Sequence, residues 1–192
     1  CQACDFGDDP QDIDYGKLYE NRFKLLRKAY ERANVGEDQE FEAYRRENAW
    51  WLDDYALFMA LKDANGGNAW FSWEKDLKMR KPEALAEARS TYAKDIRFYQ
   101  MLQYLFFKQW WELKAYVNEK GIEIIGDVPI YVAGDSADVW ANPEEFYLDE
   151  DLNPIDVAGC PPDAFSEDGQ LWGNPLFRWD VMKKNGYTWW TK

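Results

Sequence analysis

Apolar residues in the first third of the chain recur every three or four positions, the spacing that gathers them on one face of an α-helix. This stripe predicts a helix over residues 15–33, which Gly36 stops. A second helical pattern covers residues 39–62 and ends at the turn-forming segment 65–68. The stripe of the first helix consists of Tyr19, Phe23, Leu26, Tyr30 and Ala33.

A third helical pattern begins at Pro82, since proline is favoured in the first turn of a helix. It continues to Lys120, and Gly121 provides a C-terminal stop. Because this span is long for one helix, we expect a break near Ser90–Thr91.

Beyond Gly121 the pattern changes to a run of apolar, mostly β-branched residues, which is typical of a strand buried on both faces of a parallel sheet. Pro129 lacks the N–H that a strand ladder needs, so we predict a buried strand at Ile122–Gly126 and an exit segment after it. A helix, a glycine stop, a buried strand and a polar loop follow one another as in an α/β unit. The run comprises Ile122, Ile124, Ile125, Val128, Ile130 and Val132.

The last part of the chain is rich in turn-forming residues. Phe146–Leu148 and Ile155–Val157 predict two arms of a hairpin around an acidic tip, and we expect a loop from there to Trp179. A closed eight-stranded α/β barrel takes about 250 residues, whereas this chain has 192 residues. With one convincing buried strand, the sequence predicts either a helical protein with a small sheet or a piece of something larger.

The charge balance excludes some classes of partner. The chain has 36 acidic and 23 basic residues, a formal net charge of −13. This disfavours binding to nucleic acid or to an anionic membrane surface, because both need basic residues. No apolar run approaches the roughly 20 residues of a membrane span. The start, Cys1 to Gly7, lacks the features of a signal peptide, so we expect a cytoplasmic protein.

Cysteine and histidine usage limits the possible chemistry. Cys1 and Cys4 form a C-x-x-C, but only Cys160 remains as a further thiol and the chain has no His. Structural zinc takes four such ligands, so we interpret the pair as two incidental thiols and expect no metal or cofactor. Without His, acid–base chemistry in this chain would have to use carboxylates.

Two groups of residues could carry chemistry. Asp127 follows the predicted strand, at the edge where parallel α/β folds bind ligands, although a carboxylate that caps loop amides fits equally well. Residues 158–177 combine hydrogen-bonding groups suited to sugar hydroxyls with aromatic faces suited to sugar rings, although composition alone favours a turn whose aromatics fill the core. The loop contains Asp163, Phe165, Ser166, Glu167, Asp168, Gln170, Trp172 and Asn174.

Two stretches of the chain carry a family resemblance. They are GDVPIYVAGDSADVWANPEEF, which begins at Gly126, and VAGCPPDAFSEDGQLWGNPLF, which begins at Val157. Together with Asp14–Tyr30 and Trp51–Lys62, they resemble, in order, the 4-α-glucanotransferases, also called amylomaltases or disproportionating enzymes. This is glycoside hydrolase family 77 of the α-amylase clan, and the resemblance spans essentially the whole chain.

The resemblance implies an α/β fold, part of a (β/α)₈ barrel with a helical insertion at residues 1–84 and a barrel portion at residues 85–192. It implies transfer of α-1,4-glucan segments between maltodextrins with retention of configuration, through two carboxylates and a covalent intermediate. Asp127 would then be the family's acidic residue at the end of the third barrel strand. Asp163, Phe165, Ser166, Gln170, Trp172 and Asn174 would belong to a loop over the bound glucan, in which Ala164 stands where some members carry an aromatic.

The sequence departs from the family in one respect. The family's nucleophile lies in an Arg-x-Asp-His-Phe-Arg type segment, and this chain has no such segment. We therefore expect an internal piece of the enzyme that has no catalytic residue of its own and is inactive alone. A non-catalytic maltodextrin-binding module is an alternative. A helical interaction protein over Tyr15–Lys120 is a third hypothesis, which leaves the loop at 158–177 unexplained.

Overall fold

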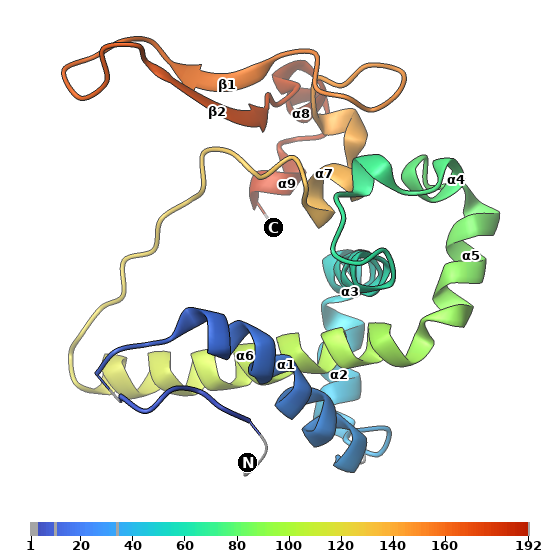
Figure 1. Cartoon of the computed structure of the whole chain (residues 1–192), viewed down its shortest axis with the longest axis vertical. Coiled ribbons are helices and arrows are strands. Elements are labelled where there is room, and N and C mark those ends of the chain that lie inside the picture. Colours follow the sequence, from blue (N-terminus) through green and yellow to red (C-terminus); the bar gives the residue numbers. More distant parts are fainter. Residues whose placement is uncertain (1–3, 10, 34, 192) are drawn as a thin grey trace.

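The computed structural model describes residues 4–9, 11–33 and 35–191, most of them in helices. Figure 1 shows a helical body built around the long helix α6, and a β-hairpin on the opposite side of the molecule. The helices are α1 (Tyr15–Arg32), α2 (Gln39–Glu47), α3 (Ala49–Ala64), α4 (Lys75–Lys78), α5 (Pro82–Thr91), α6 (Ala93–Glu119), α7 (Ala137–Ala141), α8 (Trp179–Lys184) and α9 (Thr188–Thr191). Two 3₁₀ turns, η1 (Trp70–Ser72) and η2 (Pro143–Glu145), and the strands β1 (Val157–Cys160) and β2 (Gln170–Pro175) complete the described elements.

The first predicted helix is confirmed, whereas the second is two helices. Helix α1 begins where Asp14 accepts a hydrogen bond from the backbone N–H of Lys17 at 2.9 Å. The pattern over residues 39–62 divides into α2 and α3 at Asn48, whose side-chain amide donates to the carbonyl of Tyr44 at 2.8 Å. An asparagine that bonds its own helix backbone in this way competes with continued helix, so the chain turns there.

The predicted break in the third helix is also confirmed. Helix α5 ends at Thr91 and α6 begins at Ala93, with Tyr92 between them. Gly121 adopts a positive φ of 74°, and the N–H of Ile122 returns to the carbonyl of Val117 at 3.1 Å. This left-handed glycine ends α6 in the way that the sequence predicted.

Two hydrophobic cores meet at helix α3. One lies between α1, α2, α3 and α6, and the other lies between α3, the aromatic segment at η1, and the chain that follows α6. The second core joins residues on both sides of position 84, so the described packing does not divide there and the proposed domain boundary stays a prediction. The first core contains Tyr30, Phe41, Ala56, Phe98, Tyr99, Met101 and Tyr104, and the second contains Leu57, Phe58, Leu61, Trp70, Trp73, Leu85, Ala88, Val139, Trp140, Phe146, Phe177 and Met182.

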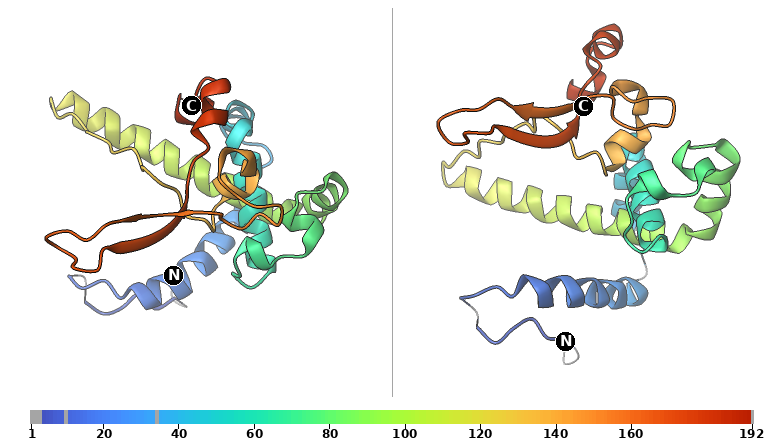
Figure 2. Two further views of the ribbon diagram at one scale, coloured as in Figure 1. Left: turned by 90° about the horizontal axis from the view of Figure 1, so that it is seen from above. Right: turned by 45° about the horizontal axis from the view of Figure 1, so that its top comes forward.

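The prediction of a buried strand at Ile122–Gly126 is wrong, because these residues are exposed and form no strand. Residues 121–130 are exposed and extended, and Ile125 is 94% exposed. A strand apolar on both faces forms only when neighbouring strands pair with it and other layers cover it. Within the described residues the one sheet is the antiparallel pair β1–β2, which does not include this segment. Figure 2 shows it as a free-standing link from α6 to α7.

The chain after α7 has more regular structure than the sequence predicted. The hairpin arms at Phe146–Leu148 and Ile155–Val157 are confirmed by an antiparallel bridge between Leu148 and Pro154 and by a hydrogen bond from Ile155 N–H to the Tyr147 carbonyl at 3.0 Å. The predicted loop at 158–177 is itself largely the hairpin β1–β2. The alternation of apolar and polar residues was obscured because residues 158–175 contain three glycines and three prolines, within the strands or beside them.

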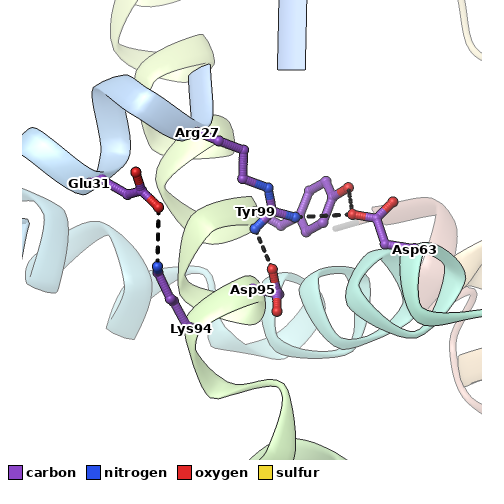
Figure 3. A network of polar contacts seen from close by, with 6 residues as sticks. All are labelled: Arg27, Glu31, Asp63, Lys94, Asp95 and Tyr99. Carbon is purple, nitrogen blue, oxygen red and sulfur yellow. Dashed lines mark hydrogen bonds and ion pairs between the residues drawn. The ribbon is translucent and has the colours of Figure 1, made fainter. Parts of the chain in front are cut away.

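An ion-pair network fixes helix α1 on the body. Figure 3 shows the Arg27 guanidinium bonded to Asp95 on α6 and, at 3.1 Å, to Asp63 on α3. Asp63 also accepts a 2.6 Å hydrogen bond from the Tyr99 hydroxyl, and the Arg27 guanidinium lies 4.0 Å from the Phe98 ring centroid. One side chain thus connects three helices through charge-assisted bonds and a cation–π contact.

We predict that Arg27→Ala lowers the free energy of unfolding by about 1–2 kcal/mol, because two carboxylates lose their partner at a partly buried position. Urea unfolding followed by circular dichroism measures this change. The matched control is Lys94→Ala, which removes an exposed 3.3 Å pair with Glu31 in the same region and should change stability by less than about 0.5 kcal/mol. Equal effects of the two substitutions would contradict the assignment.

Candidate functional site

The hairpin β1–β2 carries most of the residues that the sequence singled out. Its strands pair antiparallel, with Gly159 opposite Leu171 and Cys160 opposite Gln170. A Cβ placed on Gly159 would lie 2.5 Å from the backbone carbonyl oxygen of Gln170. The glycine is therefore required for the close approach of the two strands.

The tip of the hairpin is shaped by its own polar residues. One carboxylate oxygen of Asp163 accepts hydrogen bonds from the backbone N–H groups of Phe165 and Ser166, both at 2.8 Å. The Ser166 hydroxyl donates to the carbonyl of Gly169 at 2.7 Å, and Gly169 has a positive φ of 74°. Asp163 and Ser166 thus hold the turn in shape, which is the role that composition alone favoured for such residues.

The aromatic residues of the hairpin do not fill the core, so that part of the compositional interpretation is wrong. Phe165 is 96% exposed at the tip, and Trp172 is 45% exposed on β2. The Trp172 indole N–H donates to the Gln170 side-chain oxygen at 2.9 Å, and its ring meets the Tyr131 ring edge-on at 6.0 Å between centroids. Gln170 and Tyr131 therefore orient an exposed indole, which leaves ring surface accessible to a ligand.

The hairpin is tied to the segment that follows α6. The Asn174 side-chain amide donates to the carbonyl of Val132 at 2.8 Å. This bond brings residues 131–132 beside β2, so the two stretches that carried the family resemblance lie next to each other. Asp127 is not brought to the hairpin by any bond within the described part of the chain, because it lies in the exposed segment 121–130.

Sequence reasoning missed a set of anchoring residues just after this segment. Asp135 forms an ion pair with Lys62 of α3 and accepts a 3.3 Å hydrogen bond from the backbone N–H of Trp70. The Trp70 indole donates to the Gly134 carbonyl at 2.8 Å. Asp135 and Lys62 are 73 positions apart, so no local pattern could have paired them. The available signal was one acidic residue within an otherwise small and apolar run, before the Ser136 cap of α7.

Neither metal binding nor membrane insertion is indicated by the described residues. Among them no three His, Cys, Asp or Glu side chains lie close enough together to hold a metal ion. Cys4 and Cys160 are free thiols, while Cys1 lies outside the described residues. No helix in residues 4–9, 11–33 and 35–191 has the length and apolar character needed to cross a bilayer.

Comparison with known proteins identifies the family. The sequence profile described as 4-alpha-glucanotransferase matches residues 2–192. The chain belongs to the 4-alpha-glucanotransferase family. It is 51% identical to the 4-alpha-glucanotransferase of Thermus thermophilus over 184 residues, which is 94% of this chain and 37% of that protein. It is 48% identical to that of Clostridium butyricum over 186 residues, 96% of this chain and 38% of that protein.

A solved structure shows the same fold for this segment. Amylomaltase from Streptococcus agalactiae in complex with acarbose matches 98% of this chain and 39% of its own length, with a TM-score of 0.90 and 44% sequence identity. The chain therefore spans a little over a third of the length of the family members that it matches. The family assignment that the two sequence stretches implied is confirmed.

We predict that Gly159→Ala opens the pairing of β1 with β2, because the new methyl group meets a backbone oxygen that cannot move away alone. Overpacking of this kind costs about 1–3 kcal/mol. Hydrogen exchange of the amides in residues 157–160 and 170–175 should accelerate. Gly36→Ala is the control, since a Cβ there has no atom within 4 Å and no positive φ to strain. Unchanged exchange in the hairpin of the first variant would contradict the prediction.

Proposed function

We propose that this chain is the glucan-contacting part of a 4-α-glucanotransferase, and that its hairpin β1–β2 lies against a bound α-1,4-glucan. The observation that carries the proposal is that one hairpin presents two exposed aromatic side chains, Phe165 and Trp172. The indole of Trp172 is also held in orientation by its hydrogen bond to Gln170. The solved amylomaltase with 44% identity, described as a complex with acarbose, supports a carbohydrate ligand for this family.

The chemistry of the hairpin suits a neutral sugar. A glucose ring presents apolar faces that stack on aromatic rings and hydroxyls that bond to carboxylates and amides. Phe165 and Trp172 offer the rings, while Asp163, Gln170 and Asn174 offer polar groups beside them. Because Asp163 and Asn174 already hold the hairpin in shape, their main contribution would be to position the aromatic residues.

The proposed place of the chain in the enzyme is part of the family's (β/α)₈ barrel. The exposed apolar residues of the segment 121–130 support this, because they have the composition of a strand buried in a parallel sheet. Paired there, Asp127 would lie at the carboxyl end of a barrel strand, where such folds bind substrate. Residues 1–84 would form the helical insertion. The wider role would be in carbohydrate metabolism, and the cytoplasmic setting stays a prediction.

We predict that this chain alone does not transfer glucan segments. Retention needs two carboxylates about 5–5.5 Å apart on either side of the scissile bond, and this chain has no Arg-x-Asp-His-Phe-Arg type segment of the kind that carries the family's nucleophile. Incubation with maltotriose, followed by thin-layer or ion-exchange chromatography, should yield no maltodextrin longer than the substrate. Formation of maltotetraose and longer products would contradict this and would place a working carboxylate pair within the chain.

We predict that Trp172→Ala weakens the binding of maltoheptaose to this chain by about tenfold, which corresponds to about 1.4 kcal/mol. Isothermal titration calorimetry measures the affinity. The matched control is Trp111→Ala, because Trp111 is an exposed tryptophan on α6, far in the sequence from the hairpin. If Trp172→Ala and Trp111→Ala both bind maltoheptaose with the affinity of the unchanged chain, the hairpin is not a glucan contact.

A further inference from the structure

A pocket lies beside α7, and its lining residues are separate from the hairpin residues discussed above. It has a volume of about 580 Å³ and is bounded by the first half of α3, by α7 and η2, and by Asn185 and the start of α9. This volume falls in the range of about 300–1,000 Å³ that is typical of small-molecule sites. None of its lining residues belongs to β1 or β2.

A buried carboxylate in the pocket wall has an unused oxygen. Glu145 is only 7% exposed, and one of its oxygens accepts a 2.9 Å hydrogen bond from the Asn185 side chain. The other oxygen, Oε2, is buried and has no partner among the described residues. Burial raises the pKa of Glu145, as do the nearby Glu144 and Asp138, whereas the Asn185 bond lowers it. A buried acceptor without a partner is costly, and the residue that carries it lines the pocket.

The rest of the wall is aromatic and polar. Trp50, Trp51, Tyr55 and Trp189 line the pocket together with Asp138 and the amides of Asn142 and Asn185. The Trp50 and Trp51 rings meet edge-on at 6.5 Å between centroids, and the Trp189 indole donates to Asp138 at 3.1 Å. Each of these contacts orients a ring that borders the pocket.

The combination favours a neutral sugar over an organic cation. Asp54, which also lines the pocket, is already paired with Arg80 at 2.9 Å and Arg89 at 3.4 Å. Burial raises the pKa of Glu145, which disfavours its charged form and weakens its attraction for a cation, and a carboxyl oxygen can accept a hydrogen bond from a sugar hydroxyl. Amides, a carboxyl group and indole faces in one wall match hydroxyls and the apolar faces of a pyranose ring.

We propose that this pocket is a second carbohydrate site, which holds a glucosyl unit of a maltooligosaccharide between the tryptophans of α3 and Trp189 and bonds it through Glu145. The choice of an α-1,4-glucan as the ligand rests on the proposed function. The pocket itself does not, because its residues are separate from those of the hairpin. A long glucan chain would therefore have two contacts on this one polypeptide.

The test uses site-resolved nuclear magnetic resonance of the whole chain labelled with ¹⁵N at the tryptophan indoles, titrated with maltotriose. Resonances are assigned by Trp→Phe substitutions. We expect the indole signals of Trp50, Trp51 and Trp189 to shift saturably, independently of that of Trp172. Shifts of Trp172 alone would overturn the pocket proposal and leave the proposed function intact. Shifts of the pocket signals without Trp172 would do the reverse, and no shift at all would overturn both.

Two variants sharpen the result. Trp50→Ala should weaken the affinity of the pocket for maltotriose at least tenfold, whereas Trp111→Ala should not change it. The two tryptophans are matched in exposure, at 56% and 57%. Glu145→Gln, which keeps the shape of the side chain, should also weaken maltotriose binding in the pocket. The shift of the Trp172 indole signal with added maltotriose should stay unchanged. Equal affinities in Trp50→Ala and Trp111→Ala would overturn the proposal. So would pocket shifts produced by choline and not by maltotriose, because they would indicate a cation site.

Discussion

Helix α3 packs against two cores at once, with Ala56 in the core that holds α1 and α6 and with Leu57 and Phe58 in the core that holds Trp140. Burial of each large side chain contributes about 1.5–3 kcal/mol, and both cores share this helix. A helix apolar around most of its circumference is stable only between two layers. The helical body and the chain that carries the hairpin therefore depend on the same sixteen residues, Ala49–Ala64.

A few contacts from α3 and the neighbouring η1 hold the candidate site in position. Lys62, in the last turn of α3, pairs with Asp135, and Trp70 bonds Gly134 and Asp135 from η1. Asn174 then connects the hairpin to Val132, three positions before Asp135. Isolated surface ion pairs contribute little, but here the pair acts with two backbone-linked hydrogen bonds. The exposed aromatics of the hairpin are thus held relative to a rigid helix without being buried themselves.

The sequence predicted those features that depend on neighbours along the chain. The ends of α1 at Asp14 and of α6 at Gly121 follow from local capping. Composition and family resemblance singled out the residues at 158–177, although composition alone favoured aromatic side chains that fill the core, whereas Phe165 is exposed. The features that were missed depend on distant residues: the pairing of β1 with β2 needs Gly159 opposite Leu171, and Asp135 needs Lys62. The residues that line the pocket at Glu145 come from three separate segments, 50–55, 137–145 and 185–189, so no single window of the sequence contained it.

The error at Ile122–Gly126 shows which site residues depend on their surroundings. A chain of this size is stable by about 5–15 kcal/mol, and burial of several exposed isoleucines at about 1.5–3 kcal/mol each is of the same size. Pairing of this segment with a sheet would therefore change the stability of the chain as much as any core contact does. Asp127 lies in this exposed segment, whereas Trp172 and Glu145 are positioned by side-chain hydrogen bonds within the chain. The proposed glucan binding at Trp172 and Glu145 can accordingly be measured on this polypeptide, whereas the proposed place of Asp127 at the end of a barrel strand depends on pairing with a sheet.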